Sequence, residues 1–432
     1  MRFQAVRGMP DLLPEVLPRW QHIEAIFRQL TRCYGFSEIR LPILESTGLF
    51  KRGVGEVTDI VEKEMYIFED RNGDSLALRP EGTAGCVRAA LEHGLIHNQV
   101  QKFWYSGPMF RHERPQKGRY RQFHHLGLEV FGVETPLIDA ELIGLTAQCF
   151  KQLRLLESVS LEINTLGTPE DRVSYRHQLI QYFTVYQEQL DDDSKRRLHT
   201  NPLRILDSKN PELQDIIAKA PRMSECMSEH SRARFEKVLA LLNAGQIKYK
   251  VNHQLVRGLD YYSHTVFEWV TQTLGAQGTV CAGGRYDGLV EQLGGAPTPA
   301  IGCAIGVERV ALMLEALGVA CAFPEMPKCY LIFEESLESE VFRSVYQWRD
   351  RYSQCEFIVN LQGGNFKKQF QRAHKSGADY AVIWGVEAFN AGCVDIKSLR
   401  EIEAPEPEQQ RVSLAECEDF LKNLNINKLK LN

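Results

Sequence analysis

The chain has 432 residues, of which 44% are hydrophobic and 25% charged, so we expect an ordinary globular protein of roughly two to four domains. Its net charge of −5 excludes overall basicity as a means of binding nucleic acid, no apolar run approaches the ~18 residues of a membrane span, and the N-terminus has no apolar segment typical of a secretory signal. The eleven cysteines form no C-x-x-C pair, which argues against a disulfide framework or a structural zinc site and fits reduced cysteines in the cytoplasm.

In the first part of the chain, apolar residues at helical spacing alternate with short β-rich runs. The predicted helices are 11–34, 82–93 and 137–153. The predicted strands are Glu38–Leu41, Met65–Glu69, Ser75–Arg79, Gln101–His112 and Tyr120–Gly132. An Asn72-Gly73 pair predicts the turn of one hairpin, and a polar loop joins the last two strands into the longest hairpin.

The composition of the sequence changes over residues 165–245, which are rich in charged residues and are predicted to be helical. Beyond them, strands are predicted at Lys248–Val251, near Thr265–Val270 and at Ile301–Gly306, and Val307–Leu317 is predicted to be a helix. These patterns favour an α+β domain built on an antiparallel sheet and interrupted by a helical insertion.

The stretch Gly318–Lys328 carries two prolines and is predicted to be a linker. After it, strand and helix patterns alternate, which is typical of a small α/β domain. We therefore expect one domain over residues 1–325, interrupted by the insertion at 165–245, and a second domain over 329–432.

The sequence contains neither G-x-x-x-x-G-K-S/T nor G-x-G-x-x-G between a strand and a helix, the two common glycine-rich phosphate-binding loops. Other residues would therefore have to bind the phosphates of a nucleotide. The long hairpin offers one, because five cationic residues fall within the eleven positions Arg111–Arg121. The planar guanidinium group suits phosphate oxygens, and Phe123 could stack on a base. The alternative interpretation, a charged and solvated hairpin, stays open at this point.

The same hairpin, with Phe110-Arg111-x-Glu113 followed by Arg119-x-x-x-Phe123, resembles motif 2 of the class II aminoacyl-tRNA synthetases. The helix-to-strand stretch ending at Pro42 resembles motif 1, and Gly302–Arg309 resembles motif 3. Two further segments resemble the histidine-specific motifs of bacterial-type histidyl-tRNA synthetases, and the resemblance covers essentially the whole chain. These segments are Leu255–Tyr262 with Thr265–Glu268, and Ala282–Asp287.

The resemblance implies ATP-dependent ligation of L-histidine to tRNA(His) through a histidyl-adenylate, with release of AMP and pyrophosphate. It implies a class II catalytic domain over 1–325, an anticodon-binding domain over 329–432 and a homodimer built in part by motif 1. The motif 2 loop and the insertion would flank the acceptor end of the tRNA. Mg²⁺ is expected through the phosphates of ATP, with no organic cofactor and no zinc.

Site residues follow from the same resemblance, position by position. Arg111 and Arg257 are implied as the catalytic pair that approaches the α-phosphate from two sides. The implied ATP-binding residues are Arg111, Glu113, Arg119, Phe123 and Arg309. The implied histidine-binding residues are Glu81, Thr83, Arg111, His125, Glu129, Arg257, Tyr261, Tyr262 and Tyr286. Arg114 and Gln116 match positions that meet the acceptor end of the tRNA.

Several alternatives accompany these assignments. His125 stands where the family usually has glutamine, and a histidine ring cannot reproduce the hydrogen-bonding geometry of an amide. His124 is expected to be structural. Glu129 could instead pair with an arginine, Gly283-Gly284 could form only a tight turn, and the tyrosine pair at 261–262 could be a half-buried strand.

Two rival functions remain. One is a regulatory subunit of ATP phosphoribosyltransferase, which shares the catalytic-domain fold but typically lacks the C-terminal domain and the arginine matching Arg257. The other is a class II ligase for another amino acid, which the two histidine-type segments disfavour.

Overall fold

The computed structural model describes residues 3–55, 58–208, 210–275, 278–321, 326–400 and 409–428, without the side chains of 425–428. The chain divides into two units, Met1–Cys321 and Ala322–Asn432, and each is described by itself. Within the described residues, no helix combines the length and the apolar character needed to cross a membrane.

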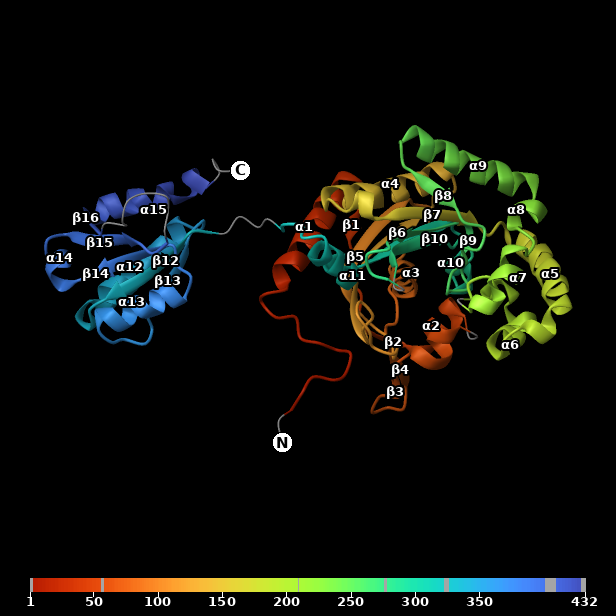
Figure 1. Cartoon of the computed structure of the whole chain (residues 1–432), viewed down its shortest axis with the longest axis horizontal. Helices are drawn as coiled ribbons and strands as arrows, with labels where there is room; N and C mark the ends of the chain where they lie inside the picture. The colour runs from red at the N-terminus through yellow and green to blue at the C-terminus, as the bar shows by residue number, and fades with distance from the viewer. Residues whose placement is uncertain are drawn as a thin grey trace. The chain divides into compact units, whose positions relative to one another are not determined.

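An eight-stranded sheet forms the centre of the first unit, with the strand order β1-β5-β6-β11-β10-β9-β7-β8 (Figure 1). Its strands are β1 (Ser37–Glu38), β5 (Gln101–Phe110), β6 (Gln122–Phe131), β7 (Ser160–Thr165), β8 (Tyr249–Val251), β9 (Ser263–Val270), β10 (Thr279–Arg285) and β11 (Ala300–Gly306). The pairs β1–β5 and β7–β8 are parallel and the others antiparallel. The predicted α+β class with an antiparallel sheet is therefore confirmed.

Helices cover both faces of this sheet. They are α1 (Leu17–Cys33), α3 (Thr83–Glu92), α4 (Pro136–Gln152), α9 (Glu229–Ala244), α10 (Leu289–Gln292) and α11 (Val307–Ala316). Successive strand residues point to opposite faces. Trp104 therefore packs with α1, α4, α9 and α11, whereas Phe103 and Tyr105 pack with α3 and α10 on the other face.

A helical segment connects β7 to β8. It contains α5 (Pro169–Val185), α6 (Asp192–Thr200), α7 (Gln214–Ala218), α8 (Met223–Cys226) and then α9. Asp171 ties its two ends together, because the carboxylate accepts hydrogen bonds from the backbone N–H of Thr168 at the start of α5 and of Ser228 at the start of α9. α9 then returns to the large sheet, where Phe235, Val238 and Leu242 join its core.

A three-stranded sheet of order β2-β4-β3 extends from the first unit beside α2 (Thr47–Val54). Its strands are β2 (Leu44–Ser46), β3 (Ile67–Glu69) and β4 (Ser75–Leu78), so the hairpin predicted around Asn72-Gly73 is confirmed. Four large apolar side chains on or beside it are 42–46% exposed: Ile43, Leu44, Ile67 and Phe68.

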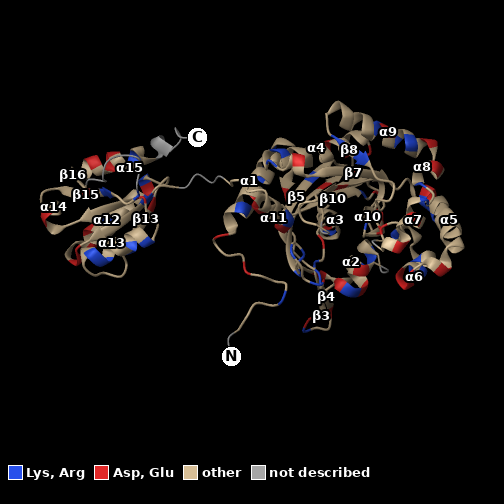
Figure 2. Cartoon of the chain, viewed as in Figure 1, with Lys and Arg blue, Asp and Glu red and all other residues tan. Residues whose placement is uncertain are grey.

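The second unit has a five-stranded mixed sheet of order β13-β12-β14-β15-β16. Its strands are β12 (Lys328–Phe333), β13 (Glu356–Val359), β14 (Tyr380–Trp384), β15 (Cys393–Ser398) and β16 (Gln410–Ser413). Its helices are α12 (Glu338–Arg351), α13 (Phe366–Lys375), α14 (Val386–Asn390) and α15 (Leu414–Lys428). The predicted alternation of strand and helix is confirmed, and Lys and Arg gather on α13 (Figure 2).

Three local predictions differ from the structure. The helix predicted from residue 11 begins at Leu17, because Pro18 is compatible with a first helical turn and poorly compatible with a helix interior. The strand predicted at Glu38–Leu41 is limited to Ser37–Glu38. In the first unit, strands β2, β7 and β10 were not predicted, and Gly283 and Gly284 lie within β10.

Candidate active site

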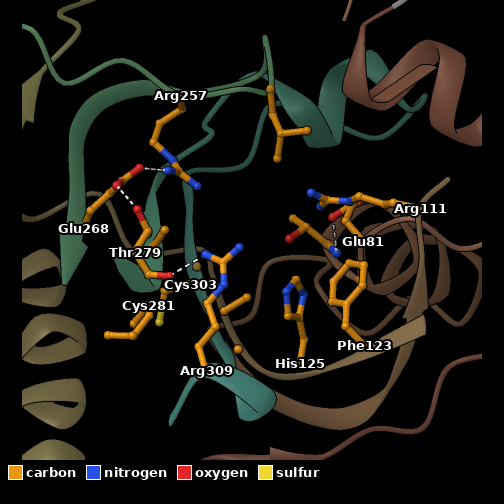
Figure 3. A pocket seen from close by; sticks show the side chains of 18 of the residues that line it. Glu81, Arg111, Phe123, His125, Arg257, Glu268, Thr279, Cys281, Cys303 and Arg309 are labelled. Carbon is orange, nitrogen blue, oxygen red and sulfur yellow. Dashed lines mark hydrogen bonds and ion pairs between the residues drawn. The ribbon is translucent and has the colours of Figure 1, made fainter. Parts of the chain in front are cut away.

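One cavity of about 280 Å³ opens on the face of the large sheet that carries Tyr105. Its walls come from the β5–β6 hairpin, the start of α3, the segment before β9, and strands β9 to β11 with the start of α11. The sequence-predicted residues among its lining are Glu81, Thr83, Arg111, Glu113, Arg119, Phe123, His125, Arg257, Tyr261, Tyr262 and Arg309. Figure 3 shows Glu81, Arg111 and Phe123 facing Arg257, Glu268 and Arg309 across it.

Arg111 is fixed on the hairpin side of the cavity. Its Nε donates to the carbonyl of Pro80 at 2.9 Å, and its guanidinium lies 5.3 Å from the centre of the Phe123 ring. Burial lowers the pKa of Arg111, and the carboxylates of Glu64 and Glu81 oppose that change. Because arginine starts from a very high pKa, the side chain stays cationic and presents a fixed fork of donors to the cavity.

Two further arginines lie on the opposite side. Arg257 forms an ion pair with Glu268 on β9, whose second oxygen accepts from the Thr279 hydroxyl at 2.8 Å. Arg309, at the start of α11, donates to the carbonyl of Thr279 at 2.5 Å and to that of Gly118 at 3.1 Å (Figure 3). Three guanidinium groups therefore converge on one cavity, which suits a ligand with several phosphate oxygens.

The loop of the hairpin forms the outer rim. Gln116 and Arg119 exchange backbone hydrogen bonds of 3.0 and 2.9 Å around Gly118, whose φ of 75° favours glycine. Arg119 pairs with Glu113 at the cavity. Arg114 and Gln116 are exposed on the loop, outside the cavity lining.

Glu81 lies at the start of α3. Its carboxylate accepts from the backbone N–H groups of Thr83, at 2.6 Å, and Ala84, at 2.9 Å, so it caps the helix. Burial raises the pKa of Glu81, and these two backbone hydrogen bonds and nearby Arg111 oppose the rise. The site therefore contains a buried acid whose anionic form the helix supports.

Glu129 and Tyr286 lie directly beneath the cavity and are not part of its lining. Glu129 is 0% exposed, and its described partners are hydroxyl groups: Thr83 at 2.7 Å, Tyr105 at 3.0 Å and Tyr286 at 2.5 Å. Burial raises the pKa of Glu129, and with the opposing effect of the hydroxyl donors the pKa is about 8. The arrangement is a carboxylate surrounded by donors and not the arginine pair that the sequence left as an alternative.

His125 lies between the two groups of arginines (Figure 3). Burial lowers the pKa of His125 to about 3, and the charges of Arg111 and Arg309 add to the effect, so the ring is neutral near pH 7. Its neighbour His124 faces the other side of the strand, where its Nδ1 lies 3.1 Å from Glu308 and its ring packs against Trp20. These contacts agree with the structural role predicted for His124.

Sequence reasoning missed two residues of the site, Glu268 and Tyr105. Glu268 lies at the end of the first histidine-type segment, and its pairing with Arg257 depends on the register of β9 and β10. Tyr105 belongs to none of the sequence motifs. Because it lies in an apolar strand, the sequence predicts only that it is a core residue.

No group of three or more His, Cys, Asp or Glu within the described residues could hold a metal ion by itself. Four glutamates nevertheless line the cavity, and two of them, Glu113 and Glu268, pair with its arginines. Mg²⁺ commonly uses one or two carboxylates together with substrate phosphates, so these residues fit an ion that arrives with a nucleotide.

Residues 66–318 match the family described as the tRNA synthetase class II core domain (G, H, P, S and T). Over 98% of its length, the chain is similar to apo histidyl-tRNA synthetase from S. aureus, with 31% identity, a TM-score of 0.80 and 100% of that chain covered. Histidyl-tRNA synthetase from Nostoc sp. PCC 7120 is 20% identical with a TM-score of 0.68, and 98% of this chain and 99% of that one are covered.

A third structure has the same fold at 22% identity and a TM-score of 0.62. It is described as an ATP phosphoribosyltransferase regulatory subunit/histidyl-tRNA synthetase from Bacillus halodurans C, and the match covers 89% of this chain and 98% of that one.

Proposed function

This chain belongs to the histidyl-tRNA synthetases, a family of class II aminoacyl-tRNA synthetases, and from that premise we propose how its cavity joins histidine to tRNA. The enzyme uses ATP, an amino acid and tRNA as substrates. The observation that carries the site assignment is the convergence of Arg111, Arg257 and Arg309 on one cavity.

ATP occupies the part of the cavity between the arginines. Its adenine lies between the Phe123 ring and the Arg309 guanidinium, an arrangement favoured by stacking and cation–π attraction. Arg119 and Arg309 hold the outer phosphates. Glu113 and Glu268 would help to hold a Mg²⁺ ion that arrives with ATP, and the ion would offset the negative charge of the phosphates.

Histidine activation places Arg111 and Arg257 on two sides of the α-phosphate. A carboxylate oxygen of histidine attacks the phosphorus, the bond to the β-phosphate oxygen breaks, and pyrophosphate leaves. Negative charge grows on the α-phosphate oxygens as this happens. Two fixed guanidinium groups stabilise that charge more strongly in the transition state than in bound ATP, which is the condition for catalysis.

Transfer to tRNA follows in the same cavity. A ribose hydroxyl at the 3′ end of the tRNA attacks the carbonyl carbon of the adenylate, and AMP leaves with the bonding electrons of the mixed anhydride. Little covalent work falls to the protein, because positioning supplies most of the acceleration.

Histidine is selected by polar groups around and beneath the cavity. Glu81 and Thr83 receive the α-amino group, and Glu129 and Tyr262 receive the two ring nitrogens. Tyr261 stands at the wall, and Tyr286 supports Glu129 from behind the lining. His125 lies beside the amino and phosphate groups and acts as a neutral ring with one donor and one acceptor. A buried polar pocket can discriminate by about 10⁴–10⁵ against analogues that leave its groups unpaired.

The tRNA is held at two places. Arg114 and Gln116 lie exposed on the hairpin loop and meet the acceptor end. In the second unit, α13 exposes Lys367, Lys368 and Lys375, a basic surface suited to the phosphate backbone of the anticodon arm (Figure 2). This local basicity offsets the net charge of −5.

A homodimer is proposed through the three-stranded sheet. Leu44 and Phe68 share one face of this sheet, because they lie opposite Leu78 and Leu76 of β4, and Ile43 adjoins the motif 1-like stretch. Contiguous exposed apolar side chains are typical of surfaces that are covered by a partner. A second copy of the chain is the partner that fits a motif 1 interface, which is self-complementary in a two-fold dimer.

The deciding experiment is ATP–pyrophosphate exchange by the full chain with each of the twenty amino acids in turn. The proposal expects exchange with histidine alone. Exchange with another amino acid would assign a different ligase. No exchange with any of them, together with binding to ATP phosphoribosyltransferase, would assign the regulatory function instead.

A further inference from the structure

The side chain of Tyr105 is clamped between two stretches of backbone. Tyr105 lies opposite Gly127 in the β5–β6 pairing, and the other side of its ring meets Gly82, just before α3. A Cβ at either glycine would overlap ring carbon atoms and the hydroxyl oxygen of Tyr105. The backbone at Gly82 and Gly127 is less able to move than a flexible side chain would be. The Tyr105 ring is therefore restricted to one position.

That position aims the Tyr105 hydroxyl at Glu129. The hydroxyl donates to Oε1 of Glu129 at 3.0 Å, and the Thr83 hydroxyl donates to the same oxygen at 2.7 Å. Oε2 accepts from Tyr286 at 2.5 Å and lies over Gly302, where a Cβ would overlap it. Three glycines and three hydroxyl groups therefore fix one carboxylate.

We propose that Tyr105 is a positioning residue for histidine selection, which orients the Glu129 carboxyl group so that its ionised form accepts an N–H of the substrate imidazole. This inference rests on the proposed function, because it assigns the imidazole to Glu129. Tyr105 lines the cavity, and the role proposed for it is exerted through Glu129, to which its hydroxyl donates.

The physical reason lies in the balance between burial and hydrogen bonding. Burial raises the pKa of Glu129, the hydroxyl donors, Tyr105 among them, oppose the rise, and the resulting pKa is about 8. A neutral carboxylic acid would offer its own proton where the site needs an acceptor. Removing one donor therefore moves the carboxyl group toward its neutral form and raises the pH needed for histidine to bind.

Other titratable groups face Glu129 from every element around it, and none of them is a cation that could replace a hydroxyl donor. They are Glu81 and Cys86 at α3, Tyr105 on β5, Tyr261 and Tyr262 before β9, Tyr286 after β10 and Cys303 on β11. Glu81 raises the pKa of Glu129 further, so the hydroxyl groups carry the opposing effect.

The test compares Tyr105→Phe with the unmodified chain in ATP–pyrophosphate exchange between pH 6 and 9.5. The ring and its contacts with Gly82 and Gly127 are kept, and one donor is lost. Tyr175→Phe is the matched control, since it removes one hydrogen bond of 2.9 Å from a buried tyrosine to the Pro221 carbonyl in the insertion.

We expect Tyr105→Phe to raise the KM for histidine about tenfold at pH 7, the size typical of a lost hydrogen bond to a charged group. The KM for ATP should stay unchanged. The ratio of kcat/KM between unmodified chain and variant cancels the ionisation of the substrate. This kcat/KM ratio should be largest at low pH. It should fall toward one as the pH rises through the pKa that Glu129 has in the variant. Tyr175→Phe should show none of this.

A loss that is the same at every pH, that extends to the KM for ATP, or that is absent would overturn the inference. If Tyr105→Phe loses its thermal unfolding transition, Tyr286→Phe carries the same test, because it removes the donor to the other oxygen. Failure of the unmodified chain to exchange with histidine would instead overturn the proposed function.

Discussion

Arg285 and Asp139 form an ion pair in which both side chains are 0% exposed, with 2.8 Å between Nη1 and Oδ2. The same guanidinium also binds Asp287 and the carbonyl of Val133 at 2.8 Å. Arg285 stands within the second histidine-type segment, yet it contacts α4 and the loop before it. Arg285 therefore stabilises the fold by linking the end of β10 to α4 and is not itself part of the cavity lining.

Replacing Arg285 with alanine should destabilise the first unit by about 3 kcal/mol, because it removes the nearer of the two arginines paired with the buried Asp139 carboxylate and leaves Arg234, at 3.6 Å. Thermal unfolding followed by circular dichroism measures the change. Arg196→Ala is the control, since its pair with Asp193 is exposed and worth about 1 kcal/mol or less. Equal losses in the two variants would show that Asp139 finds another partner.

Arg257→Ala should slow adenylate formation by about 10²–10³-fold, the typical effect of removing one charge-stabilising donor. Single-turnover formation of histidyl-adenylate measures the step, and circular dichroism checks the fold. Arg257→Lys keeps the positive charge but lacks the planar set of donors of a guanidinium group, so it should recover only part of the rate. Normal adenylation by Arg257→Ala would remove this arginine from the mechanism.

His125→Gln should retain activity within about threefold, since both side chains offer one or more donors and an acceptor. The pKa of His125 is lowered to about 3, so the folded chain holds the ring neutral at every pH above about 5. The ratio of kcat/KM between variant and unmodified chain should therefore be flat from pH 6 to 8.5. Complete loss of activity would show a contact that only the histidine ring can make.

Ending the chain at residue 321 should leave adenylation intact and weaken tRNA charging, because the cavity lies wholly within the first unit. Pyrophosphate exchange and aminoacylation measure the two steps separately. Arg114→Ala in the full chain should also lower charging without affecting exchange. Equal charging by the shortened chain would contradict the role proposed for the second unit.

Phe68→Glu should shift the chain from dimer to monomer, since it places a charge within the exposed apolar group of the three-stranded sheet. Sedimentation velocity measures the state. Val185→Glu serves as control, because that side chain is 78% exposed at the end of α5, away from this sheet. An unmodified chain that sediments as a monomer would contradict the proposed dimer.

The sequence predicted the antiparallel class and the long hairpin well. Apolar alternation and turn residues are local signals, and β5 and β6 agree with the predicted strands within about two residues. Strand β10 escaped prediction because it is glycine-rich, and glycine has low strand propensity in isolation. Its neighbours explain the composition: a Cβ at Gly283 would overlap the backbone of Gly302 and Cys303.

For the site, the resemblance supplied residue types, and the structure placed most of them around one cavity. The resemblance could not supply the arrangement of residues beneath the cavity. That Glu129 lies below the cavity lining, and that Tyr105 reaches it between Gly82 and Gly127, depends on strand register and on close backbone approach, which no single segment encodes.

Glu81 illustrates what this arrangement means for the history of the protein. Its carboxylate caps α3 through Thr83 and Ala84 and, by the proposed function, also receives the amino group of the substrate. A change at Glu81 would weaken the helix start and alter the ligand contact in the same step. Selection for a new amino acid cannot act on one of these without the other, so drift at this position is constrained twice, and divergence in specificity must begin elsewhere in the pocket.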